Sequence, residues 1–327
     1  MTTEETDHRY DFASCQTKET MVSIVIPIYN SSEKFPELFK RLTYTFSSLK
    51  IKYEIIAVVD GCSDDSTSVI EKYCRQDSRL KLIEFSRNFG HQAAITAGLE
   101  NICGEMIIIM DDDLEDPPEI LPKFIEKSQE GYDVVYGIRK KRKASLFRRV
   151  YYHIFYRLLH KLSDVDMPSD SGDFCLMRRQ VVNELNSMPE TNRYLRGMRR
   201  WVGFSQTGVE YERGTRFKGK SGYSLTKYIK FAFNAIFSFS YKPLHYVTAF
   251  GFLMSSISFL LGVRLIILKI LNKVPDVPGW VSLMVAVLFI GGVQLISIGI
   301  LGQYLARIFD EVKQRPKYII KRKTGFN

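Results

Sequence analysis

The sequence predicts an α/β domain with a mostly parallel sheet, followed by a C-terminal hairpin of two transmembrane helices. Two observations lead to this fold class. Between residues 22 and 136, short apolar runs rich in β-branched residues alternate with segments of helical periodicity, which is typical of a parallel sheet covered by helices. Towards the C-terminus, segments 244–263 and 279–306 contain no Asp, Glu, Lys or Arg, and each is long enough to cross a hydrocarbon core that needs roughly 20 residues.

The alternating part of the chain predicts its elements in order. Strands are expected at 22–29, 53–59, 80–85, 106–110 and 132–136, because each apolar run is too short for a buried helix. Helices are expected at 35–49, 66–76 and 91–101. The predicted domain boundaries are a flexible leader at 1–20, an α/β domain at 21–222, an interfacial amphipathic segment at 223–243, a transmembrane hairpin at 244–306 and a basic tail at 307–327.

The two apolar segments predict a multi-pass protein of the cytoplasmic membrane. The net charge of +10 suits either nucleic acid or an anionic membrane surface, and the hairpin favours a lipid bilayer over nucleic acid as the partner. Basic residues crowd the segment after the second span, which predicts that both termini are cytoplasmic and only the 272–279 loop lies outside. A homo-oligomer is compatible with the sequence but is not specified by it.

Two other segments are candidates for contact with the membrane surface. Residues 147–162 place apolar side chains at helical spacing beside Arg148, Arg149 and further basic residues, which suits a helix lying on a membrane. The alternative is a helix that packs on the domain core. The Phe-rich segment within 223–243 is the second interfacial candidate.

A run of acidic residues, 111–118, follows the apolar strand expected at 106–110. Open α/β sheets bind ligands at the carboxyl ends of their strands, and carboxylates crowded there are costly unless a cation neutralises them. Hard oxygen ligands suit Mg²⁺ or Mn²⁺, and Asp111 and Asp113 are spaced to share one ion that also holds a diphosphate. The alternative is an acidic, solvated loop that caps a helix.

Asp60 stands in a Gly/Ser-rich loop after the second expected strand. Its carboxylate has the chemistry to bind a base or a ribose, and the alternative is a local turn. The chain lacks a Gly-x-Gly-x-x-Gly motif and a P-loop lysine motif, which argues against a dinucleotide enzyme and a P-loop nucleotidase. Cysteine spacing predicts neither a disulfide framework nor a zinc site, so Cys62, Cys74, Cys103 and Cys175 are expected to be reduced.

Several blocks taken together resemble one family. They are residues 24–30, 59–66, 86–94, 111–118, 133–139, 171–174 and 193–197. The chain resembles family 2 glycosyltransferases of the GT-A fold, in the branch that glycosylates polyprenyl phosphates. It is similar to the bactoprenol-phosphate glucosyltransferases and related to the dolichol-phosphate mannose synthases, from about residue 21 nearly to the end.

The resemblance implies a role for each of a set of residues. The nucleotide sugar is expected at Pro27, Tyr29, Asp60, Asp111 and Asp112. Asp111, Asp113 and Glu115 are expected to hold Mg²⁺ or Mn²⁺, with Glu115 where the family usually has glutamine. Asp173, beside the reacting centre, and Asp113 are the expected catalytic residues. Arg139, Arg148 and Arg149 are expected to bind the acceptor phosphate.

The resemblance therefore implies an inverting transfer of one sugar from a nucleotide sugar, UDP-glucose as the first guess, to polyprenyl phosphate. Val59 and Cys62 depart from the family's usual Asp-Asp-Gly-Ser loop, which leaves the base unspecified. One alternative is a processive polysaccharide synthase, although Gly197 stands where such enzymes carry glutamine. The other is a non-catalytic membrane-anchored nucleotide-sugar sensor or scaffold. Asp173 acts either as a general base or as an orienting group.

Overall fold

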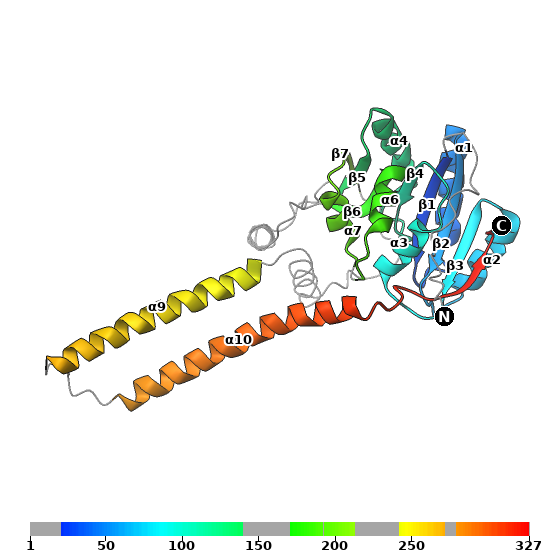
Figure 1. The fold of residues 1–327 in the computed structure, drawn as a ribbon. Coiled ribbons are helices and arrows are strands. Elements are labelled where there is room, and N and C mark those ends of the chain that lie inside the picture. Colours follow the sequence, from blue (N-terminus) through cyan, green and yellow to red (C-terminus); the bar gives the residue numbers. More distant parts are fainter. Residues whose placement is uncertain (1–20, 140–170, 192, 213–241, 272–278, 327) are drawn as a thin grey trace, which may run out of the picture.

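The computed structural model describes residues 21–139, 171–191, 193–212, 242–271 and 279–326. Short apolar runs form most of its strands, as the sequence predicts (Figure 1). The strands are β1 (Met21–Ile28), β2 (Lys52–Val59), β3 (Leu80–Phe85), β4 (Met106–Ile109), β5 (Val134–Arg139), β6 (Ser171–Arg178), β7 (Gln206–Tyr211) and β8 (Ile320–Thr324).

All these strands form one mixed sheet in the order β7-β5-β6-β4-β1-β2-β3-β8. Strands β4, β1, β2 and β3 are parallel neighbours, and β5 is parallel to β7. Strand β6 runs antiparallel between β4 and β5, so β4 and β5 end at the same edge of the sheet where β6 begins. The charged side chains of the candidate site lie at this edge.

Helices cover both faces of the sheet. Helices α1 (Phe35–Leu49), α2 (Ser66–Gln76) and α4 (Leu121–Gln129), the last preceded by a 3-10 turn η2 (Pro118–Ile120), pack on one face. Helices α3 (His91–Leu99), α6 (Arg179–Ser187) and α7 (Leu195–Trp201) pack on the other. Gly98 brings α3 close to the sheet, because a Cβ at this position would lie 2.2 Å from Val25 Cγ1.

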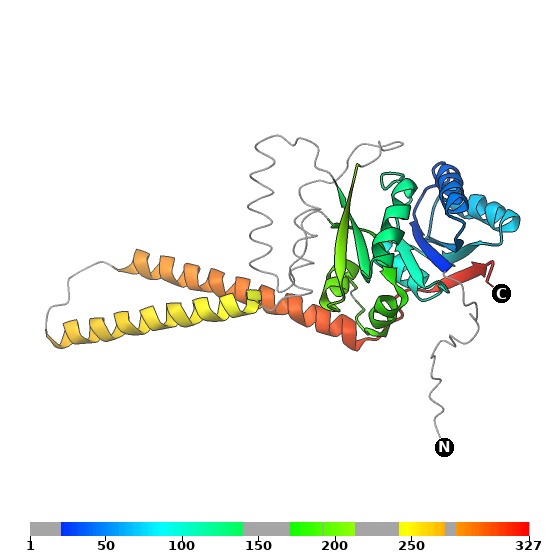
Figure 2. The ribbon, with the colours of Figure 1, turned by 90° about the horizontal axis from the view of Figure 1, so that it is seen from above.

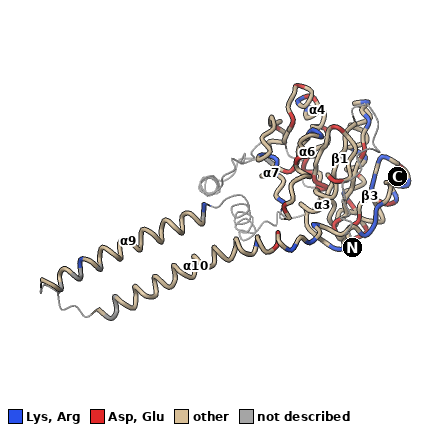
Figure 3. The backbone as a smooth tube through the Cα atoms, in the orientation of Figure 1, with Lys and Arg blue, Asp and Glu red and all other residues tan. Residues whose placement is uncertain are grey.

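The C-terminal hairpin consists of α9 (Lys242–Ile270) and α10 (Trp280–Val312). The two helices run side by side away from the sheet domain (Figures 1 and 2). Windows Leu244–Leu261 and Leu283–Val312 have mean hydropathy of 1.6 and 2.4, and none of their residues is buried. Positions of charged residues are frequent in the sheet domain and sparse along the hairpin (Figure 3). The predicted fold class is confirmed, and both helices are long and apolar enough to cross a membrane.

The segment predicted as a basic tail, 307–327, contains regular structure. Helix α10 continues to Val312, and β8 adds an antiparallel edge strand to β3. The sequence does not predict β8 because Lys321, Arg322 and Lys323 occupy most of it and no apolar alternation marks it. An edge strand needs only one backbone partner, so its side chains can stay in solvent.

Several predictions lie outside the described residues. They concern the leader at 1–20, Arg148 and Arg149 with the helix at 147–162, most of the segment at 223–243, and the 272–278 part of the hairpin loop. Among the described cysteines, Cys62, Cys74 and Cys175 are free as expected. Cys103 is disulfide-bonded, so the prediction that it is reduced is wrong. Pairing depends on the spatial approach of two Cβ atoms, which spacing along the chain does not reveal.

Candidate active site

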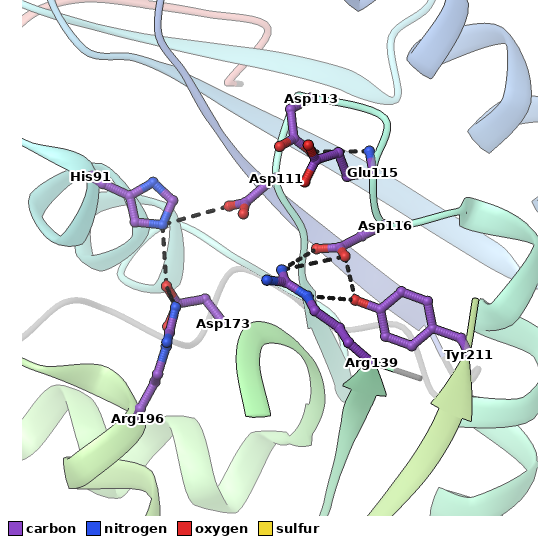
Figure 4. Close-up of polar contacts among 9 residues, drawn as sticks. All are labelled: His91, Asp111, Asp113, Glu115, Asp116, Arg139, Asp173, Arg196 and Tyr211. Carbon is purple, nitrogen blue, oxygen red and sulfur yellow. Dashed lines mark hydrogen bonds and ion pairs between the residues drawn. The ribbon is translucent and has the colours of Figure 1, made fainter. Parts of the chain in front are cut away.

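The carboxyl edge of the sheet brings together the acidic run after β4, the end of β5 and the beginning of β6 (Figure 4). Asp111 and Asp113 follow β4, Arg139 is the last residue of β5, and Asp173 lies near the start of β6. Because β4 and β5 point the same way and β6 opposes them, side chains remote in sequence converge here. The predicted position of the acids at a strand end is confirmed.

The acidic run makes a tight turn at its centre. Leu114 has a positive φ of 60°, rare for a side chain of its size, and Glu115 N donates to Asp113 Oδ1 at 3.0 Å. The Oδ2 atom of Asp112 accepts hydrogen bonds from Tyr29 N at 3.1 Å and Ser31 Oγ at 2.6 Å. Asp112 therefore ties the acidic run to the residues that follow β1.

The remaining residues predicted for the nucleotide sugar lie along the neighbouring strands. Pro27 is buried within β1 opposite Val58 of β2, whereas Tyr29 is 54% exposed just beyond that strand. Asp60 is buried, and its two carboxylate oxygens accept hydrogen bonds from Phe89 N at 2.6 Å and Gly90 N at 2.8 Å. In this structure Asp60 fixes the loop that leads into α3.

Asp173 is held by two basic side chains. Arg196 on α7 donates to both carboxylate oxygens, at 2.7 Å from Nε and 3.0 Å from Nη2. His91, the first residue of α3, places Nε2 3.4 Å from Asp173 Oδ2 and 3.6 Å from Asp111 Oδ1. His91 thus bridges the two aspartates from β4 and β6.

The charges around Asp173 keep it ionised. Burial alone would raise its pKa, but Arg196 and His91 hold the pKa of Asp173 well below its usual range. Burial likewise opposes the charged form of His91, yet Asp173 and Asp111 raise the His91 pKa overall. An aspartate with a lowered pKa is a weak proton acceptor, so this geometry suits charge stabilisation and orientation better than general-base catalysis.

Asp111 has the opposite electrostatic character. Burial, together with the nearby Asp173, Asp116 and Asp113, raises the pKa of Asp111 to about 7. Its Oδ1 atom is buried and has no hydrogen-bond partner. No three His, Cys, Asp or Glu side chains in the described part of the chain converge as a ready-made metal site. A buried carboxylate oxygen among other acids, with only the His91 ion pair beside it, nevertheless fits a divalent cation, because the cation would offset the burial and the repulsion that raise this pKa.

Arg139 belongs to a second cluster at the same edge. Its Nη2 lies 3.5 Å from both carboxylate oxygens of Asp116, and its Nε donates to Tyr211 Oη at 3.2 Å. The Tyr211 hydroxyl donates to Asp116 Oδ1 in turn. The Asp116 side chain is 1% exposed and that of Arg139 is 31% exposed, so a buried acid orients a guanidinium that still reaches solvent.

Comparison with known proteins identifies the family of this chain. The model of the family described as Glycosyl transferase family 2 matches residues 23–185, which include Asp111, Asp113 and Asp173. The uncharacterized glycosyltransferase YkcC of Bacillus subtilis (strain 168) is 42% identical over 310 residues, which cover 94% of this chain and 96% of that protein. The chain belongs to glycosyltransferase family 2.

Further similarities extend beyond the matched region of this glycosyltransferase. The SfII prophage-derived bactoprenol glucosyl transferase of Shigella flexneri is 40% identical over 303 residues, covering 92% of this chain and 97% of that one. Among solved structures, the mannosyltransferase PcManGT of Pyrobaculum calidifontis, in complex with GDP-Man and Mn²⁺, is 14% identical with a TM-score of 0.49, covering 92% of this chain and 89% of that one.

Four side chains of the candidate site were not predicted from the sequence. His91 and Arg196 stand inside blocks that carry the family resemblance, but nothing in their spacing connects them to Asp173. Asp116 was one of several acids in the run, and Tyr211 lies in a strand that the sequence did not predict. Only the convergence of separate strands and helices at one edge reveals these contacts.

Proposed function

We propose that this glycosyltransferase transfers one sugar from a nucleotide sugar to polyprenyl phosphate, with inversion, at the cytoplasmic face of the membrane. The observation that carries the proposal is that acids suited to a metal–diphosphate group and an arginine suited to a phosphate occupy one sheet edge, in a chain with a long apolar hairpin. The bactoprenol glucosyl transferase named above is similar over nearly the whole chain, which favours glucose as the sugar and UDP-glucose as the first donor to test.

On the donor side, Asp111, Asp113 and Glu115 would hold Mg²⁺ or Mn²⁺. When bound, such an ion neutralises the charge that develops on the departing diphosphate. The chain's own contribution is to place the carboxylates: the left-handed Leu114 turns the run, and the Glu115 amide fixes Asp113. Asp112 accepts a hydrogen bond from Tyr29 N and so connects this turn to the end of β1. We place the nucleotide beside Tyr29.

On the acceptor side, Arg139 is the residue that we assign to the lipid phosphate. A guanidinium stays charged and grips phosphate oxygens through parallel hydrogen bonds, and Asp116 and Tyr211 orient it from the buried side. Arg148 and Arg149 remain candidates for the same phosphate. A phosphomonoester has a second pKa of about 6, so at neutral pH the attacking oxygen is already ionised.

The acceptor's own ionisation makes a strong general base unnecessary. Asp173 is therefore assigned to orient the reacting groups and to stabilise positive charge at the anomeric carbon, which suits a carboxylate kept ionised by Arg196 and His91. The phosphate oxygen forms the new bond to that carbon while the bond to the nucleoside diphosphate breaks. No proton has to be removed from a dianionic phosphate in this step.

The test is a donor and acceptor panel with the purified full-length protein in detergent. Each of several nucleotide sugars is incubated with undecaprenyl phosphate, and both nucleoside diphosphate release and the lipid-linked sugar are measured by mass spectrometry. We expect one sugar per lipid and diphosphate release that depends on the lipid. Asp113→Asn, which keeps the side-chain shape and should abolish transfer, is the matched control for contaminating activity.

Two outcomes would contradict the proposal. Polymer formation from the nucleotide sugar alone would identify a processive polysaccharide synthase. Donor binding without turnover on any polyprenyl phosphate, in protein that binds divalent metal, would exclude this acceptor class. Neither outcome would alter the membership of glycosyltransferase family 2, which rests on sequence similarity along most of the chain.

A further inference from the structure

The end of α10 and the strand that follows it return from the hairpin to the sheet domain. We call residues 311–324 the C-terminal strap. At its start, both carboxylate oxygens of Glu311 lie 3.0 Å from Thr191 N and accept its hydrogen bond. At its end, β8 pairs with β3 from Leu82–Thr324 to Phe85–Ile320. The strap therefore contacts the sheet domain at two separate places.

The contact between the strap and β3 continues into the loop that precedes α3. The Tyr318 ring stacks on Phe85 with centroids 5.0 Å apart and planes 12° apart, and Ser86 N donates to Ile319 O at 3.0 Å. Phe85 in turn packs edge-on against Phe89, at 5.7 Å between centroids. The amides of Phe89 and Gly90 bind Asp60, and His91 follows immediately.

Tyr318 also reaches the far end of the same helix. Its hydroxyl donates to Glu100 Oε2, next to the last residue of α3. One tyrosine of the strap thus contacts the residue before the α3 loop and the residue after the α3 helix. His91 is the first residue of α3 and contacts Asp173. Tyr318, by contacting the residues on either side of α3, therefore helps to fix where His91 lies.

The contact between Glu311 and Thr191 lies close in sequence to Arg196, the other basic partner of Asp173. Thr191 lies just before α7, whose second residue is Arg196. The two sides of the site are themselves joined, because Leu195 N at the start of α7 donates to Gln92 Oε1 of α3 at 3.1 Å. Both basic side chains that hold Asp173 therefore stand on helices whose flanking residues the strap contacts, Glu100 after α3 and Thr191 before α7.

We propose that the C-terminal strap positions His91 and Arg196 around Asp173, and that Tyr318 and Glu311 are its positioning residues. The strap is continuous with α10, so the geometry of the site depends on how the hairpin is attached to the sheet domain. The ion pairs that Arg322 makes with Glu84 of β3 and Glu71 of α2 would be enough for a simple tether. The contacts of Tyr318 and Glu311 differ from these pairs, because they reach residues that flank α3 and α7.

The test compares four variants of the full-length protein in detergent. Tyr318→Leu removes the stacked ring, and Tyr318→Phe keeps the ring and removes the hydroxyl. Glu311→Ala removes the acceptor of the Thr191 amide. Arg322→Ala is the matched control, because it removes an ion pair of the same strap that faces away from the site.

Amide hydrogen exchange is the first readout, because it does not require activity. We expect Tyr318→Leu to speed exchange at residues 86–91 roughly tenfold, from the loss of one aromatic stack, while β2 stays protected. Tyr318→Phe should restore most of this protection. Glu311→Ala should speed exchange at residues 193–198 instead, and Arg322→Ala should change neither segment.

Turnover is the second readout, and here the inference rests on the proposed roles of Asp173 and its partners. Tyr318→Leu should lower kcat for sugar transfer by roughly the same factor, with Tyr318→Phe close to wild type. Uniformly faster exchange over the whole sheet domain would overturn the inference, since that is the signature of a merely structural strap. Unchanged exchange at 86–91 in folded Tyr318→Leu protein would overturn it as well. Wild-type protein that lacks transfer would instead count against the proposed function and leave the exchange result standing.

Discussion

Replacing Arg196 by alanine removes the bidentate partner of Asp173. The Asp173 side chain is 8% exposed and Arg196 is 31% exposed, so the variant leaves a largely buried carboxylate beside Asp111, another acid. His91 remains as the only other basic side chain that the described residues place at Asp173, and its Nε2 is shared with Asp111. Arg196→Ala should therefore destabilise the protein and slow sugar transfer.

The size of the effect follows from burial. Removing one partner of a fully buried ion pair costs about 3–5 kcal/mol. Arg196 keeps 31% of its side chain in solvent, and water can enter the space it leaves, so we expect about 2–3 kcal/mol. For a domain of this size each kcal/mol corresponds to roughly 2–4 °C in Tm, which predicts a Tm lowered by about 5–10 °C.

Thermal unfolding of the detergent-solubilised protein is the assay, and Arg200→Ala on the same helix is the matched control. Arg200 is exposed, so its replacement should change Tm little. The double mutant supplies the sharper comparison. Once Asp173→Asn has removed the charge, Arg196→Ala should cost less than about 1 kcal/mol. Equal costs of Arg196→Ala in both backgrounds would refute the pairing.

The pH dependence gives an independent check with a definite sign. Arg196 and His91 hold the pKa of Asp173 below its usual range, so the pair contributes its full stability above about pH 4, the ordinary pKa of an unfolded aspartate. That contribution is lost as the pH falls through the lowered pKa of the folded state. The difference in unfolding free energy between wild type and Arg196→Ala should shrink as the pH falls below about 4; a difference that grew in this range would contradict the argument.

Four further predictions concern the metal, the acid, the topology and the acceptor. Asp113→Asn should abolish transfer in folded protein, and a chelator should do so reversibly in the wild type; full activity in chelator would rule out the metal assignment. Asp173→Asn should slow transfer but keep the acidic limb of the pH–rate profile, which belongs to the acceptor phosphate; a limb that vanishes makes Asp173 the base. A cysteine at Asp276 should react with an impermeant reagent in intact cells and one at Gln314 should not, and the reverse pattern would falsify the orientation. Arg139→Lys keeps the charge without the paired hydrogen bonds, so KM for polyprenyl phosphate should rise roughly tenfold with donor affinity nearly unchanged, and equal KM values would place the phosphate elsewhere.

The sequence predicted the elements whose side chains follow a simple period. Strands up to β5 and helices α1 to α3 are apolar runs or apolar faces, and the acids after β4 follow from the strand that precedes them. Strand β8 was not predicted because it consists mostly of basic residues, whose pattern gives no sign of the backbone pairing with β3. Arg196 was missed as a partner of Asp173 because their proximity arises from α7 packing on the face that β6 also lines. Contacts of this kind depend on the order of strands in the sheet, which no local pattern contains.

The basic residues of the strap are read in the sequence as a signal for membrane topology, but in the folded protein they form ion pairs with acids of the sheet domain. Counted along the chain, Lys321 and Arg322 belong to the basic cluster that predicts a cytoplasmic C-terminus. In the folded protein, however, Lys321 lies 2.8 Å from Glu84, and Arg322 pairs with Glu84 and Glu71. Charges neutralised by protein acids add little attraction to an anionic bilayer, and ion pairs whose basic partner lies about half or more in solvent contribute little to stability. The strap is therefore held chiefly by the β3–β8 backbone ladder, by Tyr318 and by the hydrogen bond from Thr191 to Glu311. Screening by salt would therefore weaken the ion pairs without releasing β8 from the sheet. We expect the attachment of the strap to the sheet domain, and with it the effect of the hairpin on the active site, to persist at high ionic strength.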